Sequence, residues 1–257
     1  MRRAVDRMGG RLPHGWGDMF RQLGLFVLAF AFYDAVRGIA DGERAVAFAH
    51  GQQLIDLERS THTFFEPNFQ GFFLHAHFLI DIANQIYLNS QFAVVISFLI
   101  WLYLFRNDSF YFVRNMFMAA MGLALVGYAL YPAAPPRLFP QAGFIDTITD
   151  FSRVNHDTGL VKLFVNPYAA MPSMHCAFAL IISGAGIRLV RNRVGKLFWA
   201  LWPLLVMWVV VVTANHYWID AAAGALVAAA AAAIAWRLAR VRPQAWSFGT
   251  APSEAQA

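Results

Sequence analysis

Long stretches without any charged residue are the feature that most limits how this chain can fold. Asp, Glu, Lys and Arg are absent from 82–105, 115–136, 163–187, 197–219 and a shorter alanine-rich stretch at 221–236. A helix needs about 20 mainly apolar residues to cross a bilayer. Charged residues make up 14% of the chain, whereas soluble domains carry about 25%. We therefore exclude a soluble domain, a disordered protein and a nucleic-acid binder, and predict an all-α, polytopic membrane helix bundle.

The apolar stretches predict six transmembrane helices, at about 20–39, 86–105, 110–131, 174–190, 197–215 and 217–236. The stretch 72–89 is also apolar, but several polar side chains interrupt it, namely His75, His77, Asp81, Asn84 and Gln85. Each unpaired polar group is costly in hydrocarbon. We therefore expect 72–89 to form an interfacial or re-entrant helix rather than a seventh span.

The basic residues predict the orientation. With six spans and both termini in the cytoplasm, 14 of the 20 Lys and Arg residues lie on the cytoplasmic side, as the positive-inside rule requires. A seventh span would place the basic loop 188–196 outside. We expect a basic cytoplasmic segment at 1–19, a membrane domain at 20–240 and a polar cytoplasmic tail at 241–257, in the plasma or inner membrane of a bacterium with a GC-rich genome. The loops 40–85 and 132–173 then lie on the extracytoplasmic side.

Three polar clusters break the apolar pattern, and all three fall at the predicted outer ends of spans. They are Tyr131–Arg137, Met171–His175 and Asn215–Asp220. Ionisable residues at membrane depth are costly and indicate a functional site. Cys176 is the single cysteine, so no disulfide forms within the chain, and we expect it to be a small apolar residue inside a helix.

His216 and Asp220 are spaced i, i+4, which places them on one face of a helix. The carboxylate can accept a hydrogen bond from one ring nitrogen and leave the other nitrogen as a nucleophile or base. The alternative is a structural pair that links two helices.

The other two clusters can bind an anion. Pro172 and Ser173 indicate a helix start, which puts His175 in the first turn beside free backbone amides. There it can protonate a leaving oxygen, or it can be an ordinary histidine at a helix end. Arg137 follows a proline-rich turn and suits bidentate phosphate binding, or it can reach the membrane interface as a snorkelling side chain.

The three clusters together resemble the type 2 phosphatidic acid phosphatase (PAP2) superfamily, through the order Arg, Pro-Ser-x-His and His-x-x-x-Asp. The resemblance is greatest to the branch with inositolphosphorylceramide synthase and inositolphosphotransferase-like proteins. It implies a lipid phosphatase or phosphotransferase with His216 as nucleophile, Asp220 as its orienting partner and His175 as general acid and base. It also implies phosphate binding by Arg137 and by the amides around Ser173 and Met174. It further implies a membrane lipid as substrate and neither metal nor cofactor. Further candidates for substrate binding are Tyr131, Arg153, Lys162, Tyr168, Asn215 and Tyr217.

The chain departs from the usual family motifs in two cationic positions. Leu130 stands where the first motif usually has Lys, and Val209 and Val210 stand where the third begins with Ser-Arg. Arg153, Lys162 or a tyrosine hydroxyl can substitute, and the loop 138–170 either covers the site or is a plain connector. These departures leave open a non-catalytic lipid-binding scaffold or transporter with the same fold. A zinc site built from His175, His216 and Asp220 is a third alternative.

Overall fold

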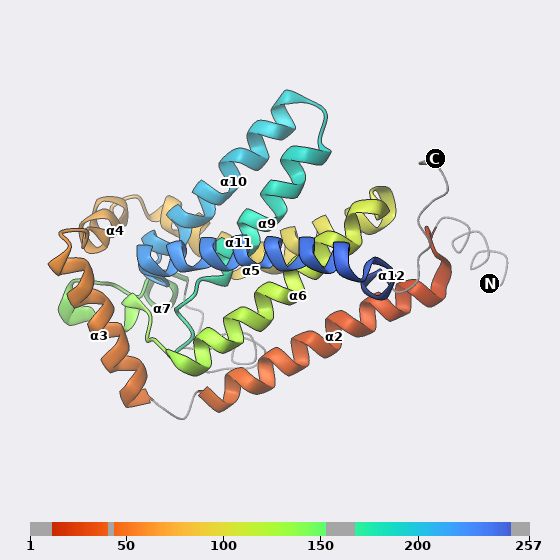
Figure 1. Cartoon of the computed structure of the whole chain (residues 1–257). Helices are drawn as coiled ribbons and strands as arrows, with labels where there is room; N and C mark the ends of the chain where they lie inside the picture. The colour runs from red at the N-terminus through yellow and green to blue at the C-terminus, as the bar shows by residue number, and fades with distance from the viewer. Residues whose placement is uncertain (1–11, 41–43, 153–167, 248–257) are drawn as a thin grey trace.

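The computed structural model describes residues 12–40, 44–152 and 168–247, which are mostly helical (Figure 1). No β-strand occurs among these described residues, apart from an isolated parallel bridge between Ala133 and Ala169. The all-α prediction is therefore confirmed. The helices are α2 (Gly15–Ala40), α3 (Arg44–Ser60), α4 (Glu66–Leu74), α5 (His77–Phe105), α6 (Asn107–Leu130), α7 (Thr147–Ser152), α9 (Met174–Leu189), α10 (Arg193–Val212), α11 (Trp218–Val241) and α12 (Pro243–Trp246), with short 3-10 turns at Pro136–Leu138 and Pro140–Ala142.

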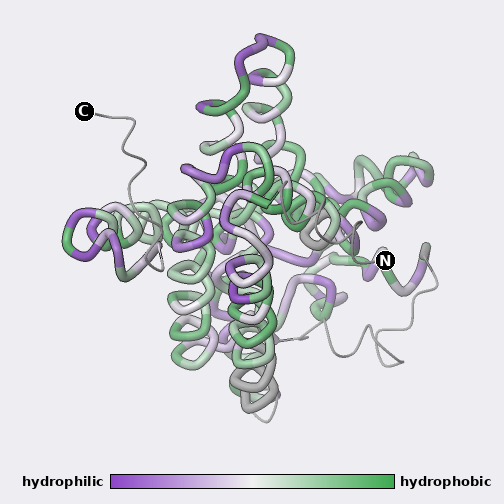
Figure 2. The backbone as a smooth tube through the Cα atoms, turned by 90° about the vertical axis from the view of Figure 1, so that its right-hand side faces the viewer, coloured by the Kyte–Doolittle hydropathy of each residue, from purple (hydrophilic) through white to green (hydrophobic). Residues whose placement is uncertain are grey.

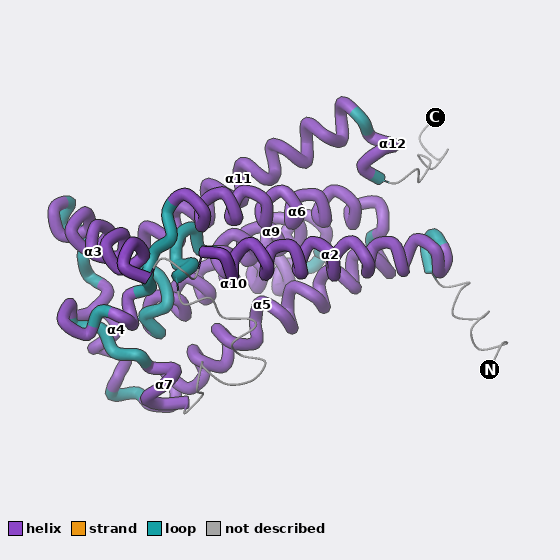
Figure 3. Tube along the Cα trace, turned by 90° about the horizontal axis from the view of Figure 1, so that it is seen from below, coloured by secondary structure: helices purple, strands orange, loops and turns teal. Residues whose placement is uncertain are grey.

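The long helices α2, α5, α6, α9, α10 and α11 alternate in direction, so that several helix ends meet at each end of the bundle. At one end α6 and α10 finish while α9 and α11 begin, and α3, α4 and α7 cover it (Figures 1 and 3). We call this the site end. At the other, the far end, α2 and α6 begin and α12 lies beside them. Figure 2 shows the bundle helices as mainly hydrophobic and the turns between them as hydrophilic.

Three helices are long and apolar enough to cross a membrane, namely Asn107–Leu130, Arg193–Val212 and Trp218–Val241. α5 gives a fourth if its two halves count as one span, and Met174–Leu189 is a shorter apolar helix. The chain is thus a membrane-type helical protein with three to four candidate spans among its described residues. Each predicted span overlaps a helix, but the count of six stays a prediction.

The stretch 72–89 includes the end of α4 and the half of α5 that precedes its bend, so the interfacial or re-entrant helix stays a prediction. α4 ends at Leu74, and the rest of the stretch is the first part of α5, which bends by 48° between His77–Asn89 and Ala93–Phe105. The polar side chains explain why it can join the bundle. Asn84 is fully buried and its amide nitrogen donates a hydrogen bond to the Thr147 carbonyl at 2.9 Å, so α7 pairs a group that hydrocarbon would leave unpaired.

Small residues allow α11 to pack closely against its neighbours. Its buried face includes Ala221, Gly224, Ala228 and Ala231, as expected for helices that approach closely. A Cβ atom on Gly224 would overlap the carbonyl oxygen of Ser173. α9 and α11 therefore approach each other closely beside the start of α9.

A buried polar cluster fastens α2 to the far end of the bundle. The carboxylate of Asp18 accepts hydrogen bonds from the hydroxyls of Tyr103 (3.0 Å) and Tyr111 (2.9 Å) and from the amide of Gln22 (2.9 Å). Arg114 donates to the side chain of Gln22 at 2.6 Å and to the Trp246 carbonyl of α12. We call Asp18, Gln22, Tyr103, Tyr111 and Arg114 the far cluster. Arg114 is therefore buried inside α6.

Candidate active site

His216 lies in a tight turn between α10 and α11. The backbone amides of Asn215 and His216 both donate to the Val210 carbonyl, at 3.0 and 3.1 Å, and Ala214 adopts a left-handed φ of 52°. The ring Nδ1 of His216 lies 2.8 Å from the Ala170 carbonyl oxygen. It also lies 3.4 Å from Oδ2 of Asp220. Because both neighbours are acceptors, Nδ1 carries the proton and Nε2 keeps the lone pair that a nucleophile needs.

Asp220 is in the first turn of α11 and is fully buried. Its Oδ2 accepts a hydrogen bond from the Tyr217 amide at 3.0 Å, which caps the helix. His216 and Asp220 lie close together, but they do not share a helix face as we predicted, because His216 precedes the start of α11. The nearer partner of His216 is nevertheless the Ala170 carbonyl, because the carboxylate is also used as the helix cap.

The start of α9 follows the sequence prediction. Ser173 is the N-cap, its hydroxyl accepts from the Cys176 amide at 3.4 Å, and Met174 is the first helical residue. The Ser173 amide donates to the Asp220 carbonyl at 3.0 Å, which joins the second and third sequence clusters. His175 stacks on Tyr87 of α5 at a centroid distance of 4.4 Å, and its ring centroid is 5.7 Å from that of His216.

Arg137 connects the first cluster to the third. Its amide donates to the Ala214 carbonyl at 2.8 Å, and its Nε donates to Oδ1 of Asn215 at 3.0 Å. One terminal nitrogen lies 3.8 Å from the Asp146 carboxylate. The Arg137 side chain is 6% exposed, so it is oriented by two polar neighbours and is not a snorkelling side chain at the surface.

The site residues open into one large cavity of about 1260 Å³. Arg137, His175, Asn215, His216 and Met174 line it, together with apolar residues of α2, α5, α6 and α9. Two histidines, an arginine and an amide thus face one space. This arrangement can hold an anionic group beside a nucleophile and a proton donor.

The other predicted residues lie elsewhere. The Tyr131 hydroxyl donates to the side chain of Gln53 at 3.2 Å and to the His50 carbonyl at 3.3 Å. Tyr217 is fully buried and its hydroxyl donates to the Ala134 carbonyl, while Tyr168 packs near Phe48. None of these three tyrosines lines the cavity. Arg153 and Lys162 lie outside the described residues.

Two buried carboxyl side chains, Glu58 and Glu66, contact the backbone at the start of α11. They were not among the residues predicted from the sequence. Glu66 accepts hydrogen bonds from the backbone amide of Trp218 at 3.1 Å and from that of Phe65 at 3.0 Å. Glu58 is fully buried against Glu66 and the amide of Ile219. Burial, followed by the charge of Glu66, raises the pKa of Glu58 to about 9. The one sequence signal was Glu66-Pro67, which is typical of a helix start.

No group of three or more His, Cys, Asp or Glu side chains is arranged for a metal ion within the described part of the chain. His175, His216 and Asp220 are all described, and they do not form such a group. The geometry therefore gives the zinc alternative no ligand set at these residues.

Comparison with protein families identifies the fold that carries this site. The family model described as PAP2 superfamily matches residues 52–234. The chain belongs to the PAP2 superfamily. Comparisons with curated proteins and with solved structures found no match. PAP2 proteins are generally phosphoesterases, which agrees with a phosphatase-type activity on a lipid phosphate. All three clusters lie within the matched region, whereas α2 precedes it.

Proposed function

We propose that this PAP2 protein is an integral-membrane enzyme that removes or transfers the phosphate group of a lipid through a phosphohistidine intermediate. The observation that carries the proposal is the convergence of Arg137, His175, Asn215 and His216 on one cavity. Arg137 would bind the phosphoryl oxygens, and its orientation by Asn215 suits this role. The membership in a phosphoesterase superfamily supports the same chemistry.

In the first step, Nε2 of His216 attacks phosphorus, a nitrogen–phosphorus bond forms and the bond to the lipid oxygen breaks. His175 gives its proton to the departing oxygen. In the second step, His175 takes a proton from the acceptor hydroxyl, whose oxygen attacks phosphorus and releases His216. The Ala170 carbonyl and Asp220 hold the Nδ1 proton of His216 and stabilise the charge that its ring acquires.

The acceptor decides between two outcomes. Water gives a phosphatase, and an alcohol gives a phosphotransferase. We propose a phosphotransferase that moves a phospho-head group such as phosphoinositol, on the resemblance of the three motifs to the inositolphosphotransferase-like branch. We place the reaction on the extracytoplasmic face of the plasma or inner membrane, because the distribution of basic residues supports cytoplasmic termini.

The decisive experiment traps the intermediate. Purified protein in detergent is mixed with a lipid bearing a ³²P-phosphate and quenched in alkali, where phosphohistidine survives. We expect label on the wild type and on His175→Ala, which accumulates at least some intermediate, and none on His216→Ala. Label that persists in His216→Ala would contradict the mechanism. The absence of label and of vanadate binding in the wild type would favour a non-catalytic scaffold or transporter.

A further inference from the structure

Two amide side chains of α5 line the same cavity as the two histidines, and the mechanism above gives them no role. Gln85 and Asn89 are spaced i, i+4, so they lie one turn apart. They belong to the half of α5 that precedes its bend. Both line the cavity and both are exposed. They therefore lie where the cavity opens to the surroundings.

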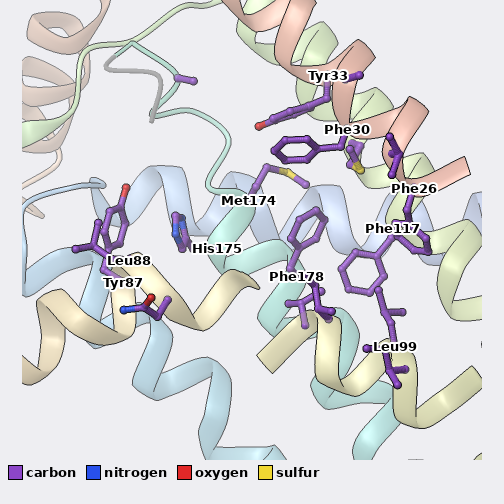
Figure 4. Close-up of a pocket in the computed structure, with 18 of the residues that line it drawn as sticks. Phe26, Phe30, Tyr33, Tyr87, Leu88, Leu99, Phe117, Met174, His175 and Phe178 are labelled. Carbon is purple, nitrogen blue, oxygen red and sulfur yellow. The ribbon is translucent and has the colours of Figure 1, made fainter. Parts of the chain in front are cut away.

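Tyr87, which lies between these amides in α5, places them beside the proton donor. Its ring stacks on His175 at a centroid distance of 4.4 Å, and Figure 4 shows Tyr87 and Leu88 beside His175 in the cavity. The ring centroids of His175 and His216 are 5.7 Å apart. Gln85 and Asn89 thus border the site where α5 contacts His175.

In-line phosphoryl transfer requires an acceptor on this side of the site. The attacking and leaving atoms lie roughly in line through phosphorus. Because Nε2 of His216 attacks, the leaving oxygen departs opposite to it, where His175 protonates it. In the second step the acceptor oxygen enters along the same line and His175 takes its proton. An acceptor molecule must therefore bind beside His175, where α5 supplies Gln85 and Asn89.

The hydrogen bonds of the two amides leave groups that suit hydroxyls. The Asn89 amide nitrogen donates to the side-chain oxygen and to the backbone carbonyl of Gln85, both at 3.1 Å. Within the described part of the chain, the Gln85 amide nitrogen and the Asn89 side-chain oxygen then have no partner. A hydroxyl both donates and accepts. One amide nitrogen and one amide oxygen can therefore bind neighbouring hydroxyl groups of one molecule.

The charges of the cavity disfavour other classes of acceptor. Among the described residues that line it, Arg137 is the only Lys or Arg, and none is Asp or Glu. An acceptor with an ammonium group would find no carboxylate there, and burial of an unpaired charge is costly. An acceptor with a further anionic group would compete with the phosphoryl group for Arg137. A neutral molecule with several hydroxyls fits this lining.

A row of polar side chains leads along α5 to the two amides. Four exposed polar residues follow one another at intervals of four, namely His77, Asp81, Gln85 and Asn89. Successive members therefore lie one turn apart. Unpaired polar groups are costly against lipid, so the row suits contact with water or with a polar ligand. It gives a water-soluble acceptor a polar approach to the cavity.

We propose that Gln85 and Asn89 form the binding site for the acceptor alcohol, and that this acceptor is a neutral polyol. The proposal rests on the proposed function, because the acceptor attacks the phosphohistidine. A hydroxyl oxygen of the polyol bonds to phosphorus and His175 receives the hydroxyl proton. The bond between phosphorus and Nε2 of His216 breaks, and its electron pair returns to that nitrogen. The polyol leaves as a phosphate ester.

Two acceptors with the same number of carbon atoms test the site. Purified protein in detergent receives ³²P-labelled phosphatidic acid with either glycerol or 1-propanol at equal concentration. The label in the alcohol phosphate is divided by the label in inorganic phosphate. Because both products form in one sample, the amount of folded protein cancels in this ratio. We expect the ratio with glycerol to exceed that with 1-propanol about tenfold, as two additional hydrogen bonds would supply.

Substitution of the amides should remove the preference for glycerol. Gln85→Ala and Asn89→Ala should each reduce it about threefold, and the double variant should lose it. Gln53→Ala is the matched control, because Gln53 is an exposed amide of α3 at the site end that does not line the cavity. It should keep the wild-type preference. A wild type without the preference, or a double variant that retains it, would overturn the acceptor site.

Binding separates failure of this site from failure of the proposed function. Glycerol binding to His216→Ala, which lacks the nucleophile, is measured by saturation-transfer NMR and compared with the same protein carrying Gln85→Ala and Asn89→Ala. We expect the glycerol signal to decrease with the two amide substitutions. That decrease, without any labelled product from the wild type, would keep the site and reject the enzymatic proposal. Equal signals from the two proteins would overturn the site.

Discussion

Two buried polar clusters lie at opposite ends of the bundle, and they differ in what their groups contact. In the far cluster, the Gln22 amide lies between the Asp18 carboxylate and the Arg114 guanidinium and bonds to both. Asp18 also accepts from two tyrosine hydroxyls, and Arg114 also donates to the Trp246 carbonyl. At the site end, Arg137 and His216 are also buried and oriented, but they line a large cavity. Gln22 and Tyr103 of the far cluster reach the same cavity, but Asp18 and Arg114 do not line it. The two clusters therefore differ in whether their buried ionisable groups face the cavity, because burial of charge is common to both.

The largest contrast is expected between the two buried arginines. Arg137→Gln removes the cation that would hold the phosphoryl oxygens, and loss of one such group costs about 10²–10³ in rate. We expect kcat/KM on a lipid phosphate to fall by about this factor, with a melting temperature close to that of the wild type. If Arg137→Gln lowered the melting temperature but left the kcat/KM of the folded protein unchanged, the role of Arg137 would be structural.

Arg114→Gln should have the opposite effect. It removes the buried guanidinium that donates to the Gln22 side chain and to the Trp246 carbonyl, and loss of a buried charged hydrogen-bonding group costs about 3 kcal/mol. Thermal unfolding in detergent should shift by about 6–12 °C, at 2–4 °C per kcal/mol for a chain of this size. The kcat of the protein that remains folded should change less than twofold. A large decrease in that kcat would mean that the far end also takes part in catalysis.

The two buried aspartates form a second pair. Asp220→Asn keeps an oxygen that can accept the Tyr217 amide but removes the charge beside His216. Positioning groups of this kind contribute about 10–100-fold, so kcat should fall by that factor with little change in KM. Asp18→Asn should instead lower the melting temperature and spare kcat. Equal effects of the two substitutions on kcat would remove the distinction between the clusters.

Functional side chains could be predicted from the sequence, whereas the backbone groups that orient them could not. The start of α9 at Ser173 could be predicted from helix capping. The His216–Asp220 pair was also predicted, but from helix spacing, whereas His216 lies in the turn before α11. The carbonyls of Ala170 and Ala214 have no signature, since any residue supplies that group, yet they hold His216 and Arg137. The position of Arg114 was equally hidden, because only tertiary packing shows that α2 and α12 cover it.

The pH dependence of folding stability tests the role of Glu58 at the site end, and this is the smallest effect that we expect. Its pKa is raised to about 9 by burial and then by the adjacent Glu66, against an ordinary value near 4.5. Between these values the folded protein keeps a proton that the unfolded chain has released. The stabilising contribution is thus complete below about pH 4.5 and is lost as the pH rises towards 9.

Glu58→Gln should remove this dependence, because an amide stays neutral throughout. From pH 5 to pH 8 we expect the wild type to lose at least about 1 kcal/mol more than the variant, or about 2–4 °C in melting temperature. Asp56→Asn is the matched control, since Asp56 lies on the same helix and is exposed, and it should keep the wild-type slope. If Glu58→Gln kept that slope as well, the carboxyl pair behind His216 would be ionised throughout, and the turn would be held against the repulsion of two charges.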